Sequence, residues 1–293
     1  MKMKKILITG AKGQLGSEIN RITKSYLDFD FEFTDVEELD ITKPEEIEDF
    51  IENKNFDYLI NCAAYTAVDK AEEDTGFASL LNKSAVGFLA KAAKKHNVAM
   101  VHVSTDYVFD GSKHTPYNES DPTCPDSAYG QTKEEGEKEF LSSGVDGIII
   151  RTSWLYSGFG NNFVKTMLRL GKERDELRVI FDQIGTPTFA ADLAKAILDI
   201  LIVANKDATK LKPAIYHYSN EGVASWYDFT RAIVDLAKLS CKILPIETKD
   251  YPLPANRPFY SVMNKALIKE TFSIEIPYWR DSLFVCLSDL GAC

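Results

Sequence analysis

The stretch KKILITGAKGQLGSEIN, residues 4–20, joins a short apolar run to three glycines in the spacing G-x-x-G-x-x-G. Gly10, Gly13 and Gly16 stand where the apolar run gives way to a helical pattern. Glycine at such a turn lets backbone amides approach a pyrophosphate, and the N-terminus of the following helix favours negative charge. A glycine turn with a purely structural role is the alternative. The stretch predicts a strand, a turn and a helix at the start of a dinucleotide-binding fold.

The rest of the first half alternates in the same way between short β-rich runs and helical patterns. Most of the runs are continuously apolar, as strands must be in a parallel sheet that is covered on both faces. This rhythm predicts an α/β fold, a Rossmann-type doubly wound parallel sheet. Thr42 and Glu45 are expected to form a capping box for the helix at 44–53. The further strands are expected at 31–35, 57–64, 98–105 and 146–154, and another helix at 76–96.

The rhythm loosens after residue 154, where amphipathic helical stretches and single strands follow each other without a regular repeat. We expect a smaller, irregular C-terminal α/β region that covers a ligand and binds the substrate. The dinucleotide-binding domain is expected at 1–153, with 188–216 returning to it, and the substrate-binding region at 154–187 and 217–293.

Composition excludes several classes of protein. The chain has 293 residues, of which 45% are hydrophobic and 27% charged, as in an ordinary globular protein. No apolar run approaches the ~18 residues of a membrane span and none suits a signal peptide, so we expect a cytoplasmic protein. A net charge of -10 argues against nucleic acid as a partner. Five scattered cysteines without a C-x-x-C pair predict free thiols rather than disulfides or a zinc site.

The ends of the second and third expected strands bear on the cofactor. Asp35 offers a carboxylate that accepts hydrogen bonds from a ribose 2′-hydroxyl and repels a 2′-phosphate, which favours NADH over NADPH. Lys12 in the glycine turn favours NADPH instead, and a solvated turn acid is the alternative for Asp35. Asp40 either caps the helix that follows or reaches the adenine. Ala63 and Ala64 leave room for a flat cofactor over the sheet edge.

Tyr129 and Lys133 begin a charged run rich in helix formers, SAYGQTKEEGEKEF at 127–140. Four residues are just over one helical turn, so the two side chains share a face. In a chain with 13 tyrosines, this spacing alone does not distinguish a proton donor with its cation from two solvated side chains. The surrounding motifs must decide between them.

Six longer motifs lie in order along the chain: NCAAYTAVDKAEED, STDYVFDG, YGQTK, RTSWLYSGFGNNFVKTMLRL, DQIGTPT and RPFYSVMN. With the glycine turn, they resemble the extended short-chain dehydrogenase/reductase family and, within it, the dTDP-4-dehydrorhamnose reductase group. The resemblance runs from about residue 4 to residue 280. The last two motifs set this group apart from epimerases and dehydratases of the same fold.

The resemblance implies NADH- or NADPH-dependent reduction of the C4 keto group of dTDP-4-dehydro-L-rhamnose to dTDP-L-rhamnose. Tyr129 is expected to protonate the developing alkoxide, Lys133 to lower the pKa of the phenol, and Thr105 to polarise the carbonyl. The residues expected at the cofactor are Gly10, Lys12, Gly13, Gln14, Leu15, Gly16, Asp35, Asp40, Ile41, Cys62, Ala63, Ala64, Tyr65, Asn82, Tyr129 and Lys133. The residues expected at the substrate are Ser104, Thr105, Asp106, Tyr107, Trp154, Asn162, Phe163 and Arg257.

Some of these residues have a second interpretation. Trp154 either stacks on the ligand or fills the core, and Arg257 either binds a diphosphate or forms a surface salt bridge. Asn82 either supports Lys133 or bonds the backbone as a buried helix residue. Three basic side chains are expected on the solvated face of an amphipathic helix: Lys165, Arg169 and Arg174.

Metal binding, assembly and reaction type have alternatives too. Some members of the group are described as dimers linked by a divalent metal; Glu18 fits one metal position, whereas Ala191 stands at another. A homodimer and Mg²⁺ at Glu18 therefore stay open. A nucleotide-sugar epimerase or dehydratase would regenerate its cofactor, whereas a reductase consumes NADH stoichiometrically. A non-catalytic subunit, resembling the regulatory subunit of methionine adenosyltransferase, would co-purify with a partner and show no turnover.

Overall fold

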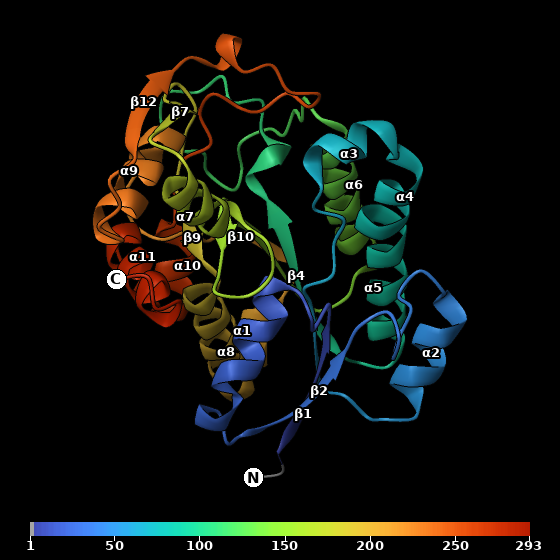
Figure 1. Cartoon of the computed structure of the whole chain (residues 1–293). Coiled ribbons are helices and arrows are strands. Elements are labelled where there is room, and N and C mark those ends of the chain that lie inside the picture. The colour runs from blue at the N-terminus through green and yellow to red at the C-terminus, as the bar shows by residue number, and fades with distance from the viewer. Residues whose placement is uncertain (1–2) are drawn as a thin grey trace.

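A six-stranded parallel sheet forms the centre of the structure, a computed structural model that describes residues 3–293 (Figure 1). Its order is β2-β1-β3-β4-β5-β10, and every neighbouring pair runs parallel. The chain leaves β1 for β2 on one side and then for β3 on the other, so the order reverses between β1 and β3. The strands are β1 (Lys4–Thr9), β2 (Phe29–Thr34), β3 (Tyr58–Asn61), β4 (Ala99–Thr105), β5 (Gly147–Thr152) and β10 (Ala214–His217).

Helices cover both faces of this sheet (Figure 1). Ile6 and Ile8 of β1 pack into a core with α1 and α8, while Leu7 between them packs into a second core with α5 and α6. Alternate residues of a strand point to opposite faces, so a strand buried on both sides must be apolar throughout. The helices are α1 (Gln14–Ile22), α8 (Ala190–Lys206) and α10 (Ala266–Phe272) on one face, and α2 (Pro44–Glu52), α5 (Ala85–Lys95) and α6 (Ala128–Ser143) on the other.

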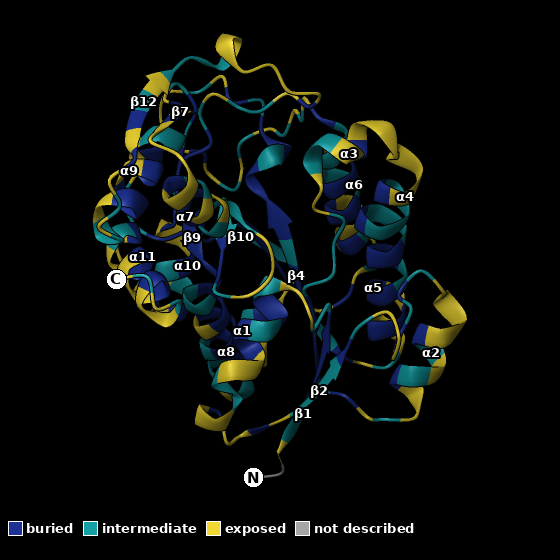
Figure 2. Cartoon of the chain, in the orientation of Figure 1, coloured by how far each residue is buried: buried dark blue, intermediate teal, exposed yellow. Residues whose placement is uncertain are grey.

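The predicted doubly wound parallel α/β fold is confirmed, and the five expected strands of the first half are present. Figure 2 shows the sheet and the inner helix faces buried, with the exposed residues on the outside. The capping box expected for α2 is wrong: Lys43 is the N-cap, and the Thr42 hydroxyl donates to Asp40 instead. The Asp40 carboxylate competes for this hydroxyl because it is only two residues away.

The single helix expected at 76–96 is interrupted. The structure has α4 (Thr75–Ser79), a π-helical turn at Leu80–Ser84 and then α5. A π turn widens the helix by one residue and is frequent at functional sites. Just before it, the short helix α3 (Val68–Glu73) follows the end of β3.

The C-terminal half builds a third core around α7 (Phe163–Glu173), α9 (Trp226–Leu236) and α11 (Trp279–Asp289). Beside them, β7 (Glu176–Ile180) and β12 (Lys242–Ile246) form a separate parallel pair. Two smaller pairs complete this part: β6 (Leu155–Tyr156) with β9 (Thr188–Phe189), and β8 (Ile184–Gly185) with β11 (Ala224–Ser225). The expected domain boundaries stay a prediction.

All five cysteines are free thiols, as the sequence predicts. Within residues 3–293, none of the helices combines the length and the apolar character that crossing a bilayer requires.

Candidate active site

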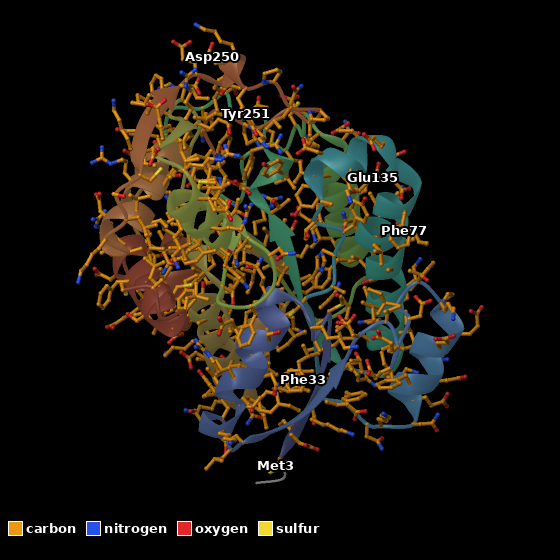
Figure 3. The ribbon with its side chains drawn as sticks, viewed as in Figure 1. Met3, Phe33, Phe77, Glu135, Asp250 and Tyr251 are labelled. Carbon is orange, nitrogen blue, oxygen red and sulfur yellow. The ribbon has the colours of Figure 1, made fainter. Side chains whose placement is uncertain are left out.

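A cleft of about 1390 Å³ opens at the carboxyl ends of β1, β3, β4 and β5. Ligands of open parallel sheets bind at this edge, beside the point where the strand order reverses. The opposite wall comes from α7, α9, the β7–β12 pair and the loop that follows β12. Asp250 and Tyr251 of that loop line the cleft and lie at the end of the molecule away from Phe33 (Figure 3).

The glycine turn after β1 admits no larger residues at two positions. A Cβ on Gly10, whose φ is +69°, would lie 2.6 Å from the backbone nitrogen of Ala63, and one on Gly16 would lie 2.5 Å from the Gly10 carbonyl oxygen. Gly13 is the N-cap of α1 and supplies no side-chain cap, so the first backbone N–H groups of α1 are left without a side-chain cap. Gly13, Gln14 and Leu15 line the cleft. This turn fits the pyrophosphate of a dinucleotide.

The carboxylate of Asp35 follows β2 but is outside the lining of the cleft. Its Oδ2 accepts from the backbone N–H of Lys12 at 2.9 Å, and its Oδ1 accepts from the N–H of Val36 at 2.9 Å. The Lys12 ammonium donates to Glu37 at 2.6 Å. The Asp35 carboxylate and the Lys12 ammonium, on which the expected choice between NADH and NADPH depends, are therefore both bonded to local partners.

Asp40 and Ile41 also lie outside the cleft lining. Asp40 Oδ1 accepts from the N–H and the hydroxyl of Thr42, at 3.0 and 2.6 Å, in the turn before α2. Ile41 is buried in the core beneath α2 and α5. In this structure Asp40 stabilises the turn before α2, and Ile41 anchors the same segment in the core.

At the end of β3, Cys62 and Ala64 line the cleft, whereas Ala63 faces the glycine turn. Burial raises the pKa of the Cys62 thiol to about 12, which keeps it protonated and unreactive. Tyr65 turns its ring toward Phe77, with the ring centroids 5.9 Å apart. That a flat cofactor lies over this edge of the sheet stays a prediction.

Asn82 lies in the π turn and is fully buried. Its amide pairs with both backbone groups of Tyr65, at 2.9 and 3.0 Å, and donates to the Thr132 hydroxyl at 3.1 Å. Of its two interpretations, the observed contacts are those of a buried residue that bonds backbone. Because Thr132 adjoins Lys133, Asn82 still ties the end of β3 to the helix that carries Lys133.

Thr105, Tyr129 and Lys133 meet in the cleft from β4 and α6. Ser127 caps α6 by accepting from the N–H of Gly130, which fixes the first turn of the helix that carries Tyr129. Lys133 is only 2% exposed, and its ammonium donates to the Val103 carbonyl at 2.7 Å.

Burial dominates the acidity of these groups. It raises the pKa of Tyr129 to about 12, although a hydrogen bond with Thr105 acts in the opposite direction. This is opposite to the lowered phenol pKa expected from the sequence, because loss of water around the ring outweighs the other contributions. Burial also lowers the pKa of Lys133 to about 8. Tyr129 thus holds its proton at neutral pH, while Lys133 is close to losing its charge.

The residues around Thr105 are polar and closely packed. Ser104, Asp106 and Tyr107 all line the cleft with it. The Thr105 hydroxyl lies 3.1 Å from Asp106 Oδ1, and burial raises the pKa of the Asp106 carboxyl to about 6. The ring of Tyr107 meets that of Tyr129 edge to face, with centroids 5.5 Å apart. Ser104 Oγ is buried without a hydrogen-bond partner among residues 3–293.

Aromatic side chains form one wall of the cleft. Trp154 stacks on Trp226 with ring centroids 3.5 Å apart and planes 7° from parallel, and Phe163 packs against Trp226 at 4.5 Å. All three rings line the cleft, and Trp154 has a backbone φ of +47°. A bulky residue in this left-handed region is strained, and such strain clusters at ligand sites.

Asn162 lines the cleft but its side chain is used within the protein. Its Oδ1 accepts from the N–H of Lys165 and caps α7, and its Nδ2 donates to Gln14 Oε1 at 2.9 Å and to the Ser157 carbonyl at 2.7 Å. Through Gln14 it joins the N-terminus of α7 to the glycine turn.

Arg257 crosses the mouth of the cleft to Asp69 on α3. Its Nη1 and Nη2 donate to the two carboxylate oxygens at 3.1 and 2.7 Å, and Nη1 also donates to the Ala255 carbonyl. The Ala255 N–H donates to the same carboxylate. The fork lowers the pKa of Asp69. Arg257 is in an ion pair and also lines the cleft, so both of its interpretations stay open.

Several residues that line the cleft are not predicted as site residues from the sequence: Arg174, Arg178, Gln183, Trp226 and Tyr251. Arg174 was expected on a solvated helix face; it lies one residue past the end of α7, where the chain turns along the cleft. Lys165 donates to loop carbonyls and Arg169 pairs with Glu173, outside the cleft. No local pattern marks the missed residues, since β7, β12 and α9 meet the cleft only after folding.

Glu18 is buried on α1, where it accepts from the Ser157 hydroxyl at 2.6 Å and pairs with Arg21 at 2.9 Å. Asp192, the acidic residue next to Ala191 at the start of α8, accepts hydrogen bonds from Asn220 and Ser282. A carboxylate neutralised by a guanidinium is a poor cation ligand, so these residues do not fit a metal site within one chain.

Comparisons with known proteins agree with this geometry. The family model described as RmlD substrate binding domain matches residues 3–291. A dTDP-4-dehydrorhamnose reductase of Burkholderia thailandensis is 42% identical, over 98% of this chain and 99% of that protein. The crystal structure of a dTDP-4-dehydrorhamnose reductase from Clostridium acetobutylicum, also 42% identical, aligns with a TM-score of 0.92 over 98% of this chain and 99% of that one.

A second solved structure is that of the Bacillus anthracis dTDP-4-dehydrorhamnose reductase in complex with NADP. It is 35% identical and aligns with a TM-score of 0.91 over 99% of this chain and all of that one. The resemblance inferred from the motifs is thereby confirmed. The chain belongs to the RmlD substrate binding domain family, the family of the dTDP-4-dehydrorhamnose reductases.

Proposed function

We propose that this protein reduces the C4 keto group of dTDP-4-dehydro-L-rhamnose to give dTDP-L-rhamnose. The observation that carries the proposal is one cleft that is lined both by Thr105, Tyr129 and Lys133 and by residues of the glycine turn. An uncapped helix N-terminus for a pyrophosphate and a buried proton donor are the two parts that a nicotinamide-dependent reductase needs.

Each side chain has a stated task in this reaction. When bound, the reduced nicotinamide supplies the hydride. Tyr129 donates its phenolic proton to the oxygen of the reacting carbonyl, and Thr105 donates a hydrogen bond to the same oxygen. A phenol with a pKa of about 12 keeps its proton until a more basic alkoxide develops. Lys133 then stabilises the phenolate by its charge.

Substrate recognition is assigned to the aromatic wall and to Arg257. Trp154 and Phe163 offer flat apolar faces for the base or the deoxysugar. Of the five guanidinium donors of Arg257, three are used by Asp69 and Ala255. The two that are left, on Nε and Nη2, form a second fork for an oxygen of the diphosphate.

The test is to incubate the purified protein with dTDP-4-dehydro-L-rhamnose and NADH or NADPH. We expect one reduced nicotinamide to be oxidised for each dTDP-L-rhamnose formed. Conversion of the sugar without net oxidation would assign an epimerase or dehydratase instead. Binding of both ligands with no turnover would point to a non-catalytic subunit.

NADH is the proposed preference, and Glu37 is expected to help set it. Glu37→Gln should raise the ratio of kcat/KM for NADPH over NADH about threefold, because it frees Lys12 to approach a 2′-phosphate. The ratio is measured at low and high salt, and high salt should shrink the effect. Glu45→Gln, an exposed acid in the first turn of α2, is the matched control. A ratio that is the same in Glu37→Gln and the control would remove Glu37 and Lys12 from cofactor choice.

Asp69→Asn is expected to raise KM for the nucleotide sugar about tenfold with little change in kcat, because Asp69 orients the fork of Arg257. Steady-state kinetics with varied sugar measure the effect. Arg257→Lys, which keeps the charge and loses the fork, should behave alike. Glu173→Gln, which removes an exposed ion pair with Arg169, is the control. A fall in kcat at unchanged KM would contradict this role.

We also propose that the protein is cytoplasmic and forms a homodimer. Light scattering on the purified protein measures the mass in solution, and a mass of 32.9 kDa would reject the homodimer.

A further inference from the structure

A row of buried polar side chains crosses three neighbouring strands close to their carboxyl ends. Thr9, Asn61 and His102 occupy paired positions on β1, β3 and β4, each at most 1% exposed. The other residues of β1 and β3 that face the two cores are apolar, whereas β4 ends in the buried polar residues Ser104 and Thr105. Polar groups in such a place cost stability unless they are bonded, so this row calls for a physical reason.

The orientation of Asn61 is fixed by a group that can only donate. The backbone N–H of Ala63 donates to Asn61 Oδ1 at 3.1 Å, and the Thr9 hydroxyl donates to the same oxygen at 2.7 Å. The flipped amide would turn its NH₂ group toward the N–H of Ala63. Asn61 Nδ2 therefore faces His102 Nδ1, 3.1 Å away.

This contact fixes the proton on His102. An amide nitrogen only donates, so Nδ1 must carry a lone pair and the ring proton of the neutral imidazole must be on Nε2. An imidazolium would place a second donor against Asn61 Nδ2. Burial and the charge of Lys133 lower the pKa of His102 well below its usual value, which agrees with a neutral ring. The ring of Phe140 is stacked against the His102 ring, with the centroids 6.4 Å apart and the planes 24° from parallel.

The Nε2–H group of His102 faces Lys133 Nζ at 3.5 Å. An ammonium has no lone pair and cannot accept from this donor, whereas a neutral amine can. The nitrogen is held in place by its own bond to the Val103 carbonyl. The row from Thr9 to His102 thus ends in a donor that favours the uncharged form of Lys133.

The other titratable groups around Lys133 act differently. On α6, Glu137 favours the charged lysine, but its carboxylate is bonded to Arg151 of β5. Tyr129 on the same helix and Cys62 after β3 both have a pKa raised by burial to about 12 and stay neutral below that. His102 is the neighbour whose proton position decides which form of Lys133 is favoured.

We propose that His102 is a positioning residue, locked by Asn61 as the Nε2–H tautomer, and that it stabilises the neutral amine of Lys133. This inference rests on the proposed reductase function. After the phenolic proton has left, an N–H proton of the Lys133 ammonium passes to the phenolate oxygen, which restores the phenol and leaves the neutral amine. Stabilising that amine favours this transfer, and the amine takes up a proton from solvent before the next turnover.

The first test reads the tautomer without any activity. Long-range ¹H–¹⁵N correlation spectra of the ¹⁵N-labelled protein, recorded from about pH 6 to pH 9, distinguish protonated from bare ring nitrogens in its four histidines. We expect His102, identified by the signals lost in His102→Asn, to keep a bare Nδ1 and a protonated Nε2 throughout. A protonated Nδ1, or titration within this range, would overturn the proposal even if the reductase assay succeeds.

The second test reverses the tautomer. In Asn61→Asp, the carboxylate accepts from Nδ1–H, so Nε2 presents a lone pair to Lys133 and favours the ammonium. We expect the spectra to show the exchange, and the alkaline limb of kcat to lie about one pH unit higher than in the wild type. His217→Phe changes another buried histidine, whose ring nitrogens have no partner among residues 3–293, and should leave the limb in place.

A limb that stays in place after the tautomer has exchanged would overturn the role of His102. If the wild type shows no turnover, the proposed function fails while the spectra still decide the tautomer.

Discussion

Tyr129→Phe is expected to bind reduced nicotinamide as the wild type does and to lose at least ~100-fold in kcat, the scale of a missing proton donor. The substitution removes one oxygen from a ring held against Tyr107 and leaves the capped first turn of α6 intact. Fluorescence titration with NADH measures binding, and single-turnover oxidation of NADH in the presence of the keto-sugar measures the chemical step.

Tyr260→Phe is the matched control, because it removes a hydroxyl from a tyrosine outside the cleft lining. We expect its kcat to stay within about twofold of the wild type, because the half-buried ring of Tyr260 packs near Tyr117 and keeps that packing as phenylalanine. A Tyr129→Phe protein with most of its turnover would assign the proton transfer to another donor, of which Thr105 and Asp106 are the nearest to hand. Loss of NADH binding in the same variant would mean that the tyrosine holds the cofactor instead.

The parts of this site that the sequence predicts are those encoded by local patterns. Apolar runs mark β1, β3, β4 and β5, and the glycine spacing marks the turn after β1. Parallel strands bring their carboxyl ends to one edge, so residues that follow such strands meet without further information. Thr105 at the end of β4 could be placed in the cleft for this reason.

The parts that the sequence does not predict depend on contacts between distant segments. Asp69 and Arg257 are 188 positions apart and belong to a short helix and to a loop, neither of which has a periodic pattern. The stack of Trp154 on Trp226 requires Trp154 to adopt a left-handed backbone conformation, and no turn motif in the sequence indicates it. Such pairs are set by packing of the C-terminal region, where sequence periodicity is weak.

The pKa values of buried groups are a further property that local sequence patterns do not predict. A lysine four residues after a tyrosine suggests a lowered phenol pKa, yet burial raises the pKa of Tyr129 to about 12. Burial depends on how far α6 sinks against β4, which is a property of the packed structure. For a proton donor in a reduction, the raised value is compatible with function because the proton must stay on the phenol until the alkoxide forms.

Glu137→Leu is expected to lower the free energy of unfolding by about 3–5 kcal/mol, because it leaves the Arg151 guanidinium buried without its carboxylate. Both side chains are 3% exposed, and Arg151 Nε and Nη2 donate to the two oxygens of Glu137 at 2.9 and 2.6 Å. This fork joins α6, which carries Tyr129 and Lys133, to β5. Urea denaturation at neutral pH measures the loss.

The double variant Glu137→Leu with Arg151→Met should recover most of that stability, since an apolar pair of similar volume replaces the ion pair and no charge is left unpaired. Glu173→Ala, which breaks the exposed pair with Arg169, should cost no more than about 0.5 kcal/mol. Equal losses for the buried and the exposed pair would show that Glu137 and Arg151 are hydrated in solution. The buried fork also holds α6 at a set distance from the sheet edge where Thr105 lies. A double variant that is as stable as the wild type but has a lower kcat would therefore show that the ion pair positions α6 for the reaction.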